Sequence, residues 1–435
     1  MRSSLQVVSQ GPESALRASS RPKVLLTDTD RRSYTARLAL ALVDAGCDVA
    51  AICSNNGDLV RKTGIVTRIF PYGALRPVDS LIHAISESSP DVIVPCDDRG
   101  VRHLHELHAS AQSAESARPG ITDLIERSLG SPGGYAAALC RYDLLRIAHE
   151  EGLRVPRTEL LQTEEDLARC EGEQRFPWVI KADETWGGRG VRIAHSRKEA
   201  QESFAELSHP FRLPRVLKRA SVNRDPFWVK PWWERRKPSI VVQAHIQGRP
   251  ANCAVVCSEG KVLAGIAVEV LSADGPTGPA SIVRIVDDST MMNCAERIAQ
   301  RLKISGFFGL DFVIEDGTNE AYLIEMNPRC TPLCHLRLGV GRDMIGALWA
   351  QLSGSPVPAT EPVTDNNMIA YFPQALKSRS EYLSLSFLDV PQAPAELIDE
   401  FLRPWPERSL LFRLMNRLQQ LRSTFASHTS RKSVV

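Results

Sequence analysis

Two carboxylates and an amide lie around one tight turn in the second half of the chain. The turn, Asp316-Gly317, separates two runs of alternating apolar and polar residues, a pattern typical of a β-hairpin. Folding the chain back about this turn brings Asp311 opposite Ile324–Glu325, to within about one residue. Side chains alternate along a strand, so Leu323, Glu325 and Asn327 are expected to share one face.

Carboxylate and amide oxygens suit a hard divalent cation. Mg²⁺ usually takes few protein ligands and completes its shell with water and phosphate oxygens. Asp311, Glu325 and Asn327 are therefore predicted to hold Mg²⁺, with Mn²⁺ as an alternative ion, and Arg329 follows where its planar fork can reach a phosphate. The alternative is a hairpin whose acids simply face water. Leu323 disfavours it, because an apolar residue on that face indicates partial cover.

A lysine and three glycines form a second group. Lys181 ends an apolar run, and Gly187, Gly188 and Gly190 follow before the next apolar run begins. Glycines let backbone N–H groups approach phosphate closely, and the lysine adds positive charge. The lysine precedes the glycines, which excludes a P-loop. A glycine-rich turn without a ligand is the alternative interpretation.

A third group, Asp97, Asp98 and Arg99, follows the apolar run Asp91–Pro95. Ligands bind at the carboxyl ends of strands in open α/β sheets, so these three residues are candidate substrate contacts. Helix capping by Asp97 or Asp98 is an equally good explanation.

The elements that position these groups fall into two classes. In the first part of the chain short apolar runs alternate with amphipathic stretches, which predicts a doubly wound α/β domain over residues 21–130. Its expected strands are Lys23–Asp28, Val49–Cys53, Val66–Phe70 and Asp91–Pro95, and its expected helices include Ser33–Ala45 and Val78–Glu87.

From residue 131 to 355 the pattern changes to strands in hairpins with helices between them, which predicts an α+β domain on an antiparallel sheet. Its two subdomains are expected at about 155–242 and 243–355. Residues 1–20 are expected to be disordered. Residues 356–435 are expected to form a C-terminal extension that opens with a strand at Met368–Phe372 and ends in a helical tail, the amphipathic helix Leu410–Phe425.

Composition narrows the class of protein. The net charge of +2 excludes a general polyanion binder, and the ten cysteines form no C-x-x-C pair, which excludes zinc-ribbon and thioredoxin-like sites. No signal peptide and no long apolar run is visible, so we expect reduced thiols, no transmembrane segment and a cytoplasmic location.

Taken in their order along the chain, these motifs resemble the ATP-grasp superfamily, which includes D-alanine–D-alanine ligase, biotin carboxylase and carbamoyl phosphate synthetase. The resemblance covers roughly residues 22–355, and an acid followed by Glu325-Met326-Asn327-Pro328-Arg329 is its most specific part. It implies that Lys181 and the glycines Gly187, Gly188 and Gly190 contact the ATP phosphates. It further implies a magnesium site at Asp311, Glu325 and Asn327, catalytic roles for Lys181 and Arg329, and an adenine slot lined by Gln243, Ala244, His245 and Ile246.

Two positions depart from the family pattern. Arg141 stands where many members carry an ATP-binding lysine, which keeps the charge but changes its geometry. Gln243-Ala244 stands where the linker often carries an acid, so the usual ribose contact has no candidate.

The resemblance implies an ATP- and Mg²⁺-dependent ligase that activates a small-molecule carboxylate as an acyl phosphate for attack by an amine or another nucleophile. The alternative is an ATP-binding regulatory or scaffold protein with the same fold. Residues 212–237 carry nine Lys/Arg with three tryptophans, a pattern that can bind single-stranded nucleic acid. Within this fold we favour an insertion at the rim of the active site that steers an acidic substrate, and expect no nucleic-acid partner. Association into a homo-oligomer stays open.

Overall fold

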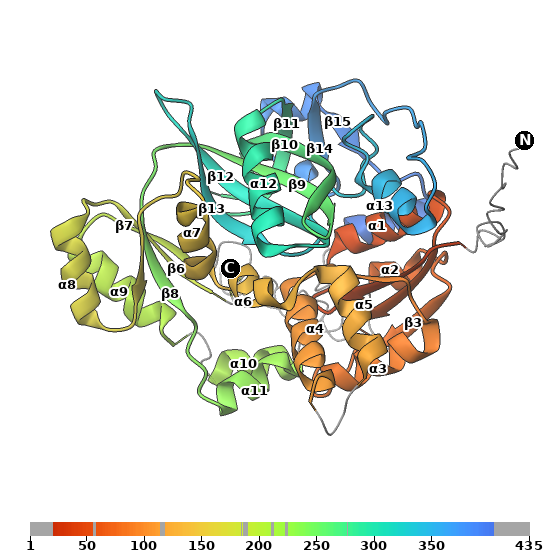
Figure 1. The fold of residues 1–435 in the computed structure, drawn as a ribbon. Helices are drawn as coiled ribbons and strands as arrows, with labels where there is room; N and C mark the ends of the chain where they lie inside the picture. The colour runs from red at the N-terminus through yellow and green to blue at the C-terminus, as the bar shows by residue number, and fades with distance from the viewer. Residues whose placement is uncertain are drawn as a thin grey trace, which may run out of the picture.

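The computed structural model describes residues 21–54, 58–113, 118–183, 185, 190–209, 213–221, 225–275 and 277–403. Figure 1 shows three sheets arranged around a central region. Within the described ranges, no helix combines the length and the apolar character that crossing a bilayer requires.

The N-terminal sheet is parallel, with strand order β3-β2-β1-β4. Its strands are β1 (Lys23–Asp28), β2 (Asp48–Cys53), β3 (Arg68–Pro71) and β4 (Val92–Pro95). The helices are α1 (Ser33–Asp44), α2 (Leu59–Lys62), α3 (Pro77–Ser88), α4 (Asp98–Ala111) and α5 (Pro119–Leu129).

Both faces of this sheet are buried. Leu26 packs with residues of α1 and α2, whereas Ile93 packs with residues of α3, α4 and α5. The apolar runs therefore form strands covered on two sides, as parallel sheets require. The predicted strands and helices of this region lie within two residues of the observed ones.

A second, antiparallel sheet has the order β5-β8-β6-β7. Its strands are β5 (Thr158–Leu161), β6 (Trp178–Ala182), β7 (Val191–Ala194) and β8 (Ile240–Ala244). The helices of this part are α8 (Glu164–Glu173), α9 (Arg197–Leu207), α10 (Leu213–Ser221) and α11 (Val229–Trp233), with the short 3-10 helix η2 (Pro226–Trp228). Only α8 and α9 cover this sheet, while α10 and α11 lie away from it, toward α4 (Figure 1).

The largest sheet has seven strands in the order β13-β12-β9-β10-β11-β14-β15. They are β9 (Gly248–Ser258), β10 (Lys261–Ala273), β11 (Ala280–Val286), β12 (Gly306–Glu315), β13 (Ala321–Asn327), β14 (Met368–Tyr371) and β15 (Phe387–Asp389). The helices associated with it are α6 (Tyr135–Leu139), α7 (Arg141–Glu150), α12 (Ser289–Leu302), α13 (Met344–Ser353) and α14 (Ala395–Leu402).

One face of the seven-stranded sheet packs on α7 and α12, through residues such as Leu144, Ile298 and Phe308. On the other face Val256 shares a continuous core with Leu348 of α13 and with helix α1 of the N-terminal part. The N-terminal sheet and the large sheet are therefore joined by one apolar core.

The first part of the predicted C-terminal extension joins the seven-stranded sheet. The predicted strand at Met368–Phe372 is present as β14. Strand β14 pairs with β11 and β15 pairs with β14, so residues 368–389 contribute two strands to the large sheet. The carboxylate of Asp389 in β15 accepts hydrogen bonds from Arg37 of α1 and from His335, and this buried contact ties the C-terminal strand to the N-terminal part. The amphipathic helix predicted at 410–425 lies outside the described residues.

Candidate active site

The acidic hairpin has the predicted register. β12 and β13 are antiparallel, Asp311 lies opposite Glu325, and Gly309 lies opposite Asn327. The two carboxylates therefore occupy neighbouring strands at the same level of the sheet.

The predicted face of Leu323 is wrong, because β13 contains a bulge. Asp311 pairs with Glu325 but the next residue, Phe312, pairs with Leu323, so Ile324 has no partner in the ladder. Leu323 is fully buried with Phe312 in the core, on the side away from Asp311. A bulge redirects the side chains that follow it, and this one turns Glu325 toward Asp311.

Asp311 lies in an electrostatically unfavourable position. Burial, and then the charge of Glu325, raise the pKa of Asp311 to about 6, although Asn327, Arg329 and Lys181 oppose the shift. Burial also acts to raise the pKa of Glu325, but Arg141 and Lys181 outweigh it and the pKa is lowered. Two half-buried carboxylates that repel each other, one with a raised pKa, are a donor set whose repulsion a divalent cation would relieve.

Asn327 lies beside these carboxylates. Its Nδ2 donates to Asp311 Oδ2 at 3.1 Å, while its Oδ1 accepts from Arg329 Nη2 at 2.9 Å. An amide oxygen has two lone pairs, so Oδ1 can bind a cation while it accepts from Arg329. In the present orientation, however, the NH₂ group faces Asp311, so ligation requires the amide oxygen to turn partly toward Asp311. The two carboxylates are the stronger part of the predicted set.

Two cations face the carboxylates. Arg141 Nη1 donates to Asp183 Oδ1 at 2.6 Å and Nη2 lies 3.0 Å from Glu325 Oε2, while its buried Nε has no hydrogen-bond partner among the described residues. Lys181 is 5% exposed, and burial, followed by the charge of Arg141, lowers its pKa to about 8. Arg141 is the first residue of α7, and its role in ATP binding stays a prediction.

Asp183 was missed by the sequence reasoning. It lies two residues after Lys181, directly after β6, and connects the four-stranded sheet to Arg141 of α7. Its only signal in the sequence was that distance from Lys181, which marks it as a residue at a strand end.

Only one of the three predicted loop glycines can be placed, because Gly187 and Gly188 lie outside the described residues. Gly190 is buried, its carbonyl accepts from Ala182 N at 2.9 Å, and a Cβ there would collide with the side chain of Thr185. The two ends of the loop are therefore held together where a larger residue does not fit.

The predicted adenine linker lies at the junction of the two antiparallel sheets. β8 ends at Ala244 and β9 begins at Gly248, so His245 and Ile246 form the connection. Gln243 is 2% exposed and its Nε2 donates to the Ile324 carbonyl at 3.4 Å, across the junction. Lining of an adenine slot by these residues stays a prediction.

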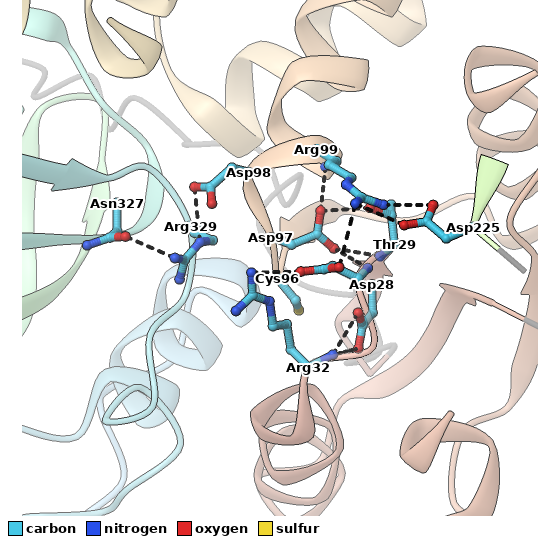
Figure 2. A network of polar contacts seen from close by, with 12 residues as sticks. Asp28, Thr29, Arg32, Cys96, Asp97, Asp98, Arg99, Asp225, Asn327 and Arg329 are labelled. Carbon is cyan, nitrogen blue, oxygen red and sulfur yellow. Dashed lines mark hydrogen bonds and ion pairs between the residues drawn. The ribbon is translucent and has the colours of Figure 1, made fainter. Parts of the chain in front are cut away.

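The N-terminal candidates separate into different roles. The carboxylate of Asp97 accepts from the backbone N–H groups of Thr29 and Gly100, and from the Thr29 hydroxyl, so it caps α4 and fixes the end of β1. Asp98 accepts from Arg329 Nε at 3.1 Å (Figure 2). Arg99 is 1% exposed and pairs with Asp225. The capping explanation accounts for Asp97, and we do not place it in the site.

A cavity of about 340 Å³ connects these groups. On the hairpin side it is lined by Arg141, Asp183, Asp311, Glu325 and Asn327. On the side of the N-terminal sheet it is lined by Arg32, Tyr34, Asp98, Arg99 and Phe227. Arg329 lies between, bonded to Asn327 on one side and Asp98 on the other (Figure 2).

The family comparison decides what this arrangement belongs to. Residues 141–332 match the family model of the ATP-grasp domain. The chain contains an ATP-grasp domain. The matched span of this domain begins at Arg141 and includes Lys181, Asp311, Glu325, Asn327 and Arg329.

Relatives agree with this identification. The chain is 24% identical to the carbamoyl phosphate synthase large chain of Pyrococcus furiosus over 215 residues, which is 49% of this chain but only 19% of that protein.

Solved structures show the same fold. The biotin carboxylase domain of 2-oxoglutarate carboxylase from Hydrogenobacter thermophilus, in complex with MgADP, ADP and bicarbonate, aligns at TM-score 0.53 and 15% identity, covering 78% of this chain and 71% of that one. Biotin carboxylase from Campylobacter jejuni, in complex with β-γ-ATP, aligns at TM-score 0.54 and 15% identity, covering 79% and 73%.

Proposed function

We propose that this protein is an ATP- and Mg²⁺-dependent ligase that activates a small-molecule carboxylate as an acyl phosphate and joins it to an amine or a related nucleophile. The observation that carries the proposal is the carboxylate pair Asp311 and Glu325, which lines a cavity of about 340 Å³ together with Arg141. The buried Lys181 adds a second positive charge that acts on this pair, and the cavity extends to the N-terminal sheet.

The donor set suits Mg²⁺, which Asp311 and Glu325 would hold, together with Asn327 after a turn of its amide. The bound ion would neutralise phosphate charge during transfer. Mn²⁺, with the same preference for oxygen ligands, is the alternative ion.

The cations of this chain have complementary tasks. Lys181, whose pKa is lowered to about 8, remains mostly protonated at pH 7 and would attract phosphate oxygens. Arg141 lines the cavity and is oriented by Asp183, so its guanidinium would add a second positive charge for the phosphates. The glycine-loop ends at Thr185 and Gly190 would bring backbone N–H groups to the same anion.

Arg329 would orient the transferred phosphoryl group and the substrate. Its guanidinium donates to Asn327, Asp98 and the Tyr34 hydroxyl, so its position is fixed from both sides of the cavity. Such preorganised charge lowers a barrier without a covalent enzyme nucleophile. Asp98, on the same guanidinium, is the N-terminal candidate we retain as a substrate contact.

Two further observations support the proposal. The solved relatives named above hold ADP or an ATP analogue, and one holds MgADP with bicarbonate. Residues 243–246, the predicted adenine linker, connect the four-stranded sheet to the seven-stranded sheet, and a nucleotide bound there would be enclosed between the two.

The test is phosphate release from MgATP in the presence of a panel of carboxylates, including bicarbonate, amino acids and dicarboxylates, each with and without an amine. We expect at least one combination to increase release about tenfold over MgATP alone. Nucleotide binding without release in any combination would instead favour the regulatory or scaffold function. Absence of nucleotide binding would contradict both.

A further inference from the structure

The insertion between α9 and β8 crosses to another part of the molecule. Its elements α10, η2 and α11 interrupt the chain of the four-stranded antiparallel sheet, yet they lie next to α4 of the N-terminal part (Figure 1). The four-stranded sheet is thereby connected to the N-terminal part through the described residues of this insertion, 213–221 and 225–237.

The contact is centred on Arg99 of α4. Its Nη1 and Nη2 donate to the two carboxylate oxygens of Asp225, each at 3.1 Å, a bidentate pair in which the fork matches the carboxylate. The guanidinium also lies 4.2 Å from the ring centroid of Phe227 and 5.5 Å from that of Trp228. Arg99 is 1% exposed, so the pair is shielded from water and from screening.

Other side chains of the N-terminal part lie around Arg99 and Phe227. The His103 ring meets Phe227 edge-on at 5.9 Å, and the Tyr72 hydroxyl lies 3.0 Å from His103 Nε2. Asp30 of the N-terminal part lies 3.7 Å from Arg99. Figure 2 shows Arg99 held between Asp225 and the β1 end.

This contact forms part of the cavity wall. Arg99 and Phe227 both line the cavity, whereas Asp225 does not. In Figure 2 Asp225 and Asn327 lie on opposite sides of Asp98 and Arg329, so this part of the wall belongs to the side of the cavity that faces the N-terminal sheet.

We infer that Asp225 is a positioning residue that latches the insertion onto α4 through Arg99 and thereby holds Phe227 against the substrate side of the cavity. Phe227 then determines which carboxylate substrates fit, while nucleotide binding depends on the opposite side. The role of Phe227 in substrate selection rests on the proposed function, whereas the contact of Asp225 with Arg99 does not.

The first experiment tests only whether Asp225 holds the insertion against α4. Hydrogen–deuterium exchange of full-length Asp225→Asn should be about tenfold faster than wild type in peptides covering residues 225–237 and unchanged in peptides covering β9 and β12. Asp225→Glu, which keeps the carboxylate, should exchange within about twofold of wild type, and so should the control Glu234→Gln, whose ion pairs stay within the insertion. Unchanged exchange in Asp225→Asn would overturn the latch.

The second experiment measures its consequence. With the carboxylate that gives most phosphate release in the panel, Asp225→Asn and Phe227→Leu should each raise KM for that carboxylate about tenfold. Affinity for a non-hydrolysable ATP analogue, measured by calorimetry, should stay within about twofold. An equal loss of nucleotide affinity would show that the insertion supports the whole site, which contradicts a role on the substrate side.

The two proposals fail in different ways. If no carboxylate stimulates release, the proposed ligase function is wrong, while the exchange data still decide the latch. If Asp225→Asn does not fold, Phe227→Leu retains the ion pair and decides the selectivity by the same KM measurement.

Discussion

The two acidic clusters on either side of Arg329 are built from the same residue types but differ in how their charges are satisfied. Around Asp97, the carboxylate accepts hydrogen bonds from backbone N–H groups and from a hydroxyl. Around Asp311, the carboxylate faces another carboxylate, and burial with this repulsion raises the pKa of Asp311 to about 6. Acid content alone therefore does not identify a reactive site; what distinguishes the Asp311 cluster is that its two repelling carboxylates line a cavity together with Arg141.

The largest expected effect tests the hairpin cluster. Glu325→Ala or Asp311→Ala should reduce ATP turnover to background, at least about 10³-fold, because the cation site loses half of its carboxylates. Steady-state phosphate release measures it, and circular dichroism should show an intact fold. The matched control is Glu320→Ala on the same hairpin, an exposed acid paired with Arg154, which should retain wild-type turnover. Full turnover in both hairpin-cluster variants would remove the metal assignment.

A smaller effect is expected from the opposing cation. Lys181→Ala should weaken binding of a non-hydrolysable ATP analogue about 10- to 100-fold, since one charge-assisted contact with phosphate is lost in a buried site. Isothermal titration calorimetry measures the affinity. Lys198→Ala, an exposed lysine on α9 of the same part, is the control and should bind as wild type. Equal affinities in all three proteins would show that Lys181 is a structural residue.

Lowering the pH should weaken nucleotide binding through the hairpin cluster by about tenfold. Asp311, with a pKa of about 6, is about nine-tenths ionised at pH 7 and one-tenth at pH 5, so Mg²⁺-dependent nucleotide affinity should fall about tenfold over this range. The same raised pKa makes protonation stabilising in the metal-free protein, so this contribution to stability is present below pH 4 and is lost as the pH rises through 6. Calorimetry at several pH values, with Asp311→Asn as the control, measures the effect. An affinity that does not vary with pH would contradict the raised pKa.

Substitution of Asp97 should lower the stability of the protein and leave its nucleotide affinity almost unchanged. Asp97→Ala removes the cap of α4 and leaves the buried Thr29 and Gly100 N–H groups without their acceptor, so unfolding free energy should fall by about 2 kcal/mol. Nucleotide affinity of the folded protein should stay within about twofold. Asp79→Ala, an exposed acid in the first turn of α3, should change stability by less than about 0.5 kcal/mol. A loss of affinity without a loss of stability would place Asp97 in the site after all.

Several features could be predicted because they depend on neighbouring residues. The Asp316-Gly317 turn sets the hairpin register, which brought Asp311 opposite Glu325. Apolar runs located the strands of the N-terminal part to within two residues.

Other features depend on contacts between distant residues and left no local signal. The bulge at Ile324 reverses the face of Leu323, and no turn residue marks it. Asp183 and Asp225 acquire their roles only when Arg141 and Arg99 arrive from other parts of the chain. The pairing of β14 with β11 joins residues about ninety apart, which strand propensity alone does not specify.

The position of β14 in the large sheet has a practical consequence for any shortened version of the chain. A fragment ending at residue 355 would contain every predicted nucleotide contact but would leave one side of β11 without its neighbour. Ile282 and Val283, both fully buried in the intact protein, would then border an open row of N–H and C=O groups. Such an edge recruits other chains, so the fragment should aggregate, and expression should extend to at least residue 403.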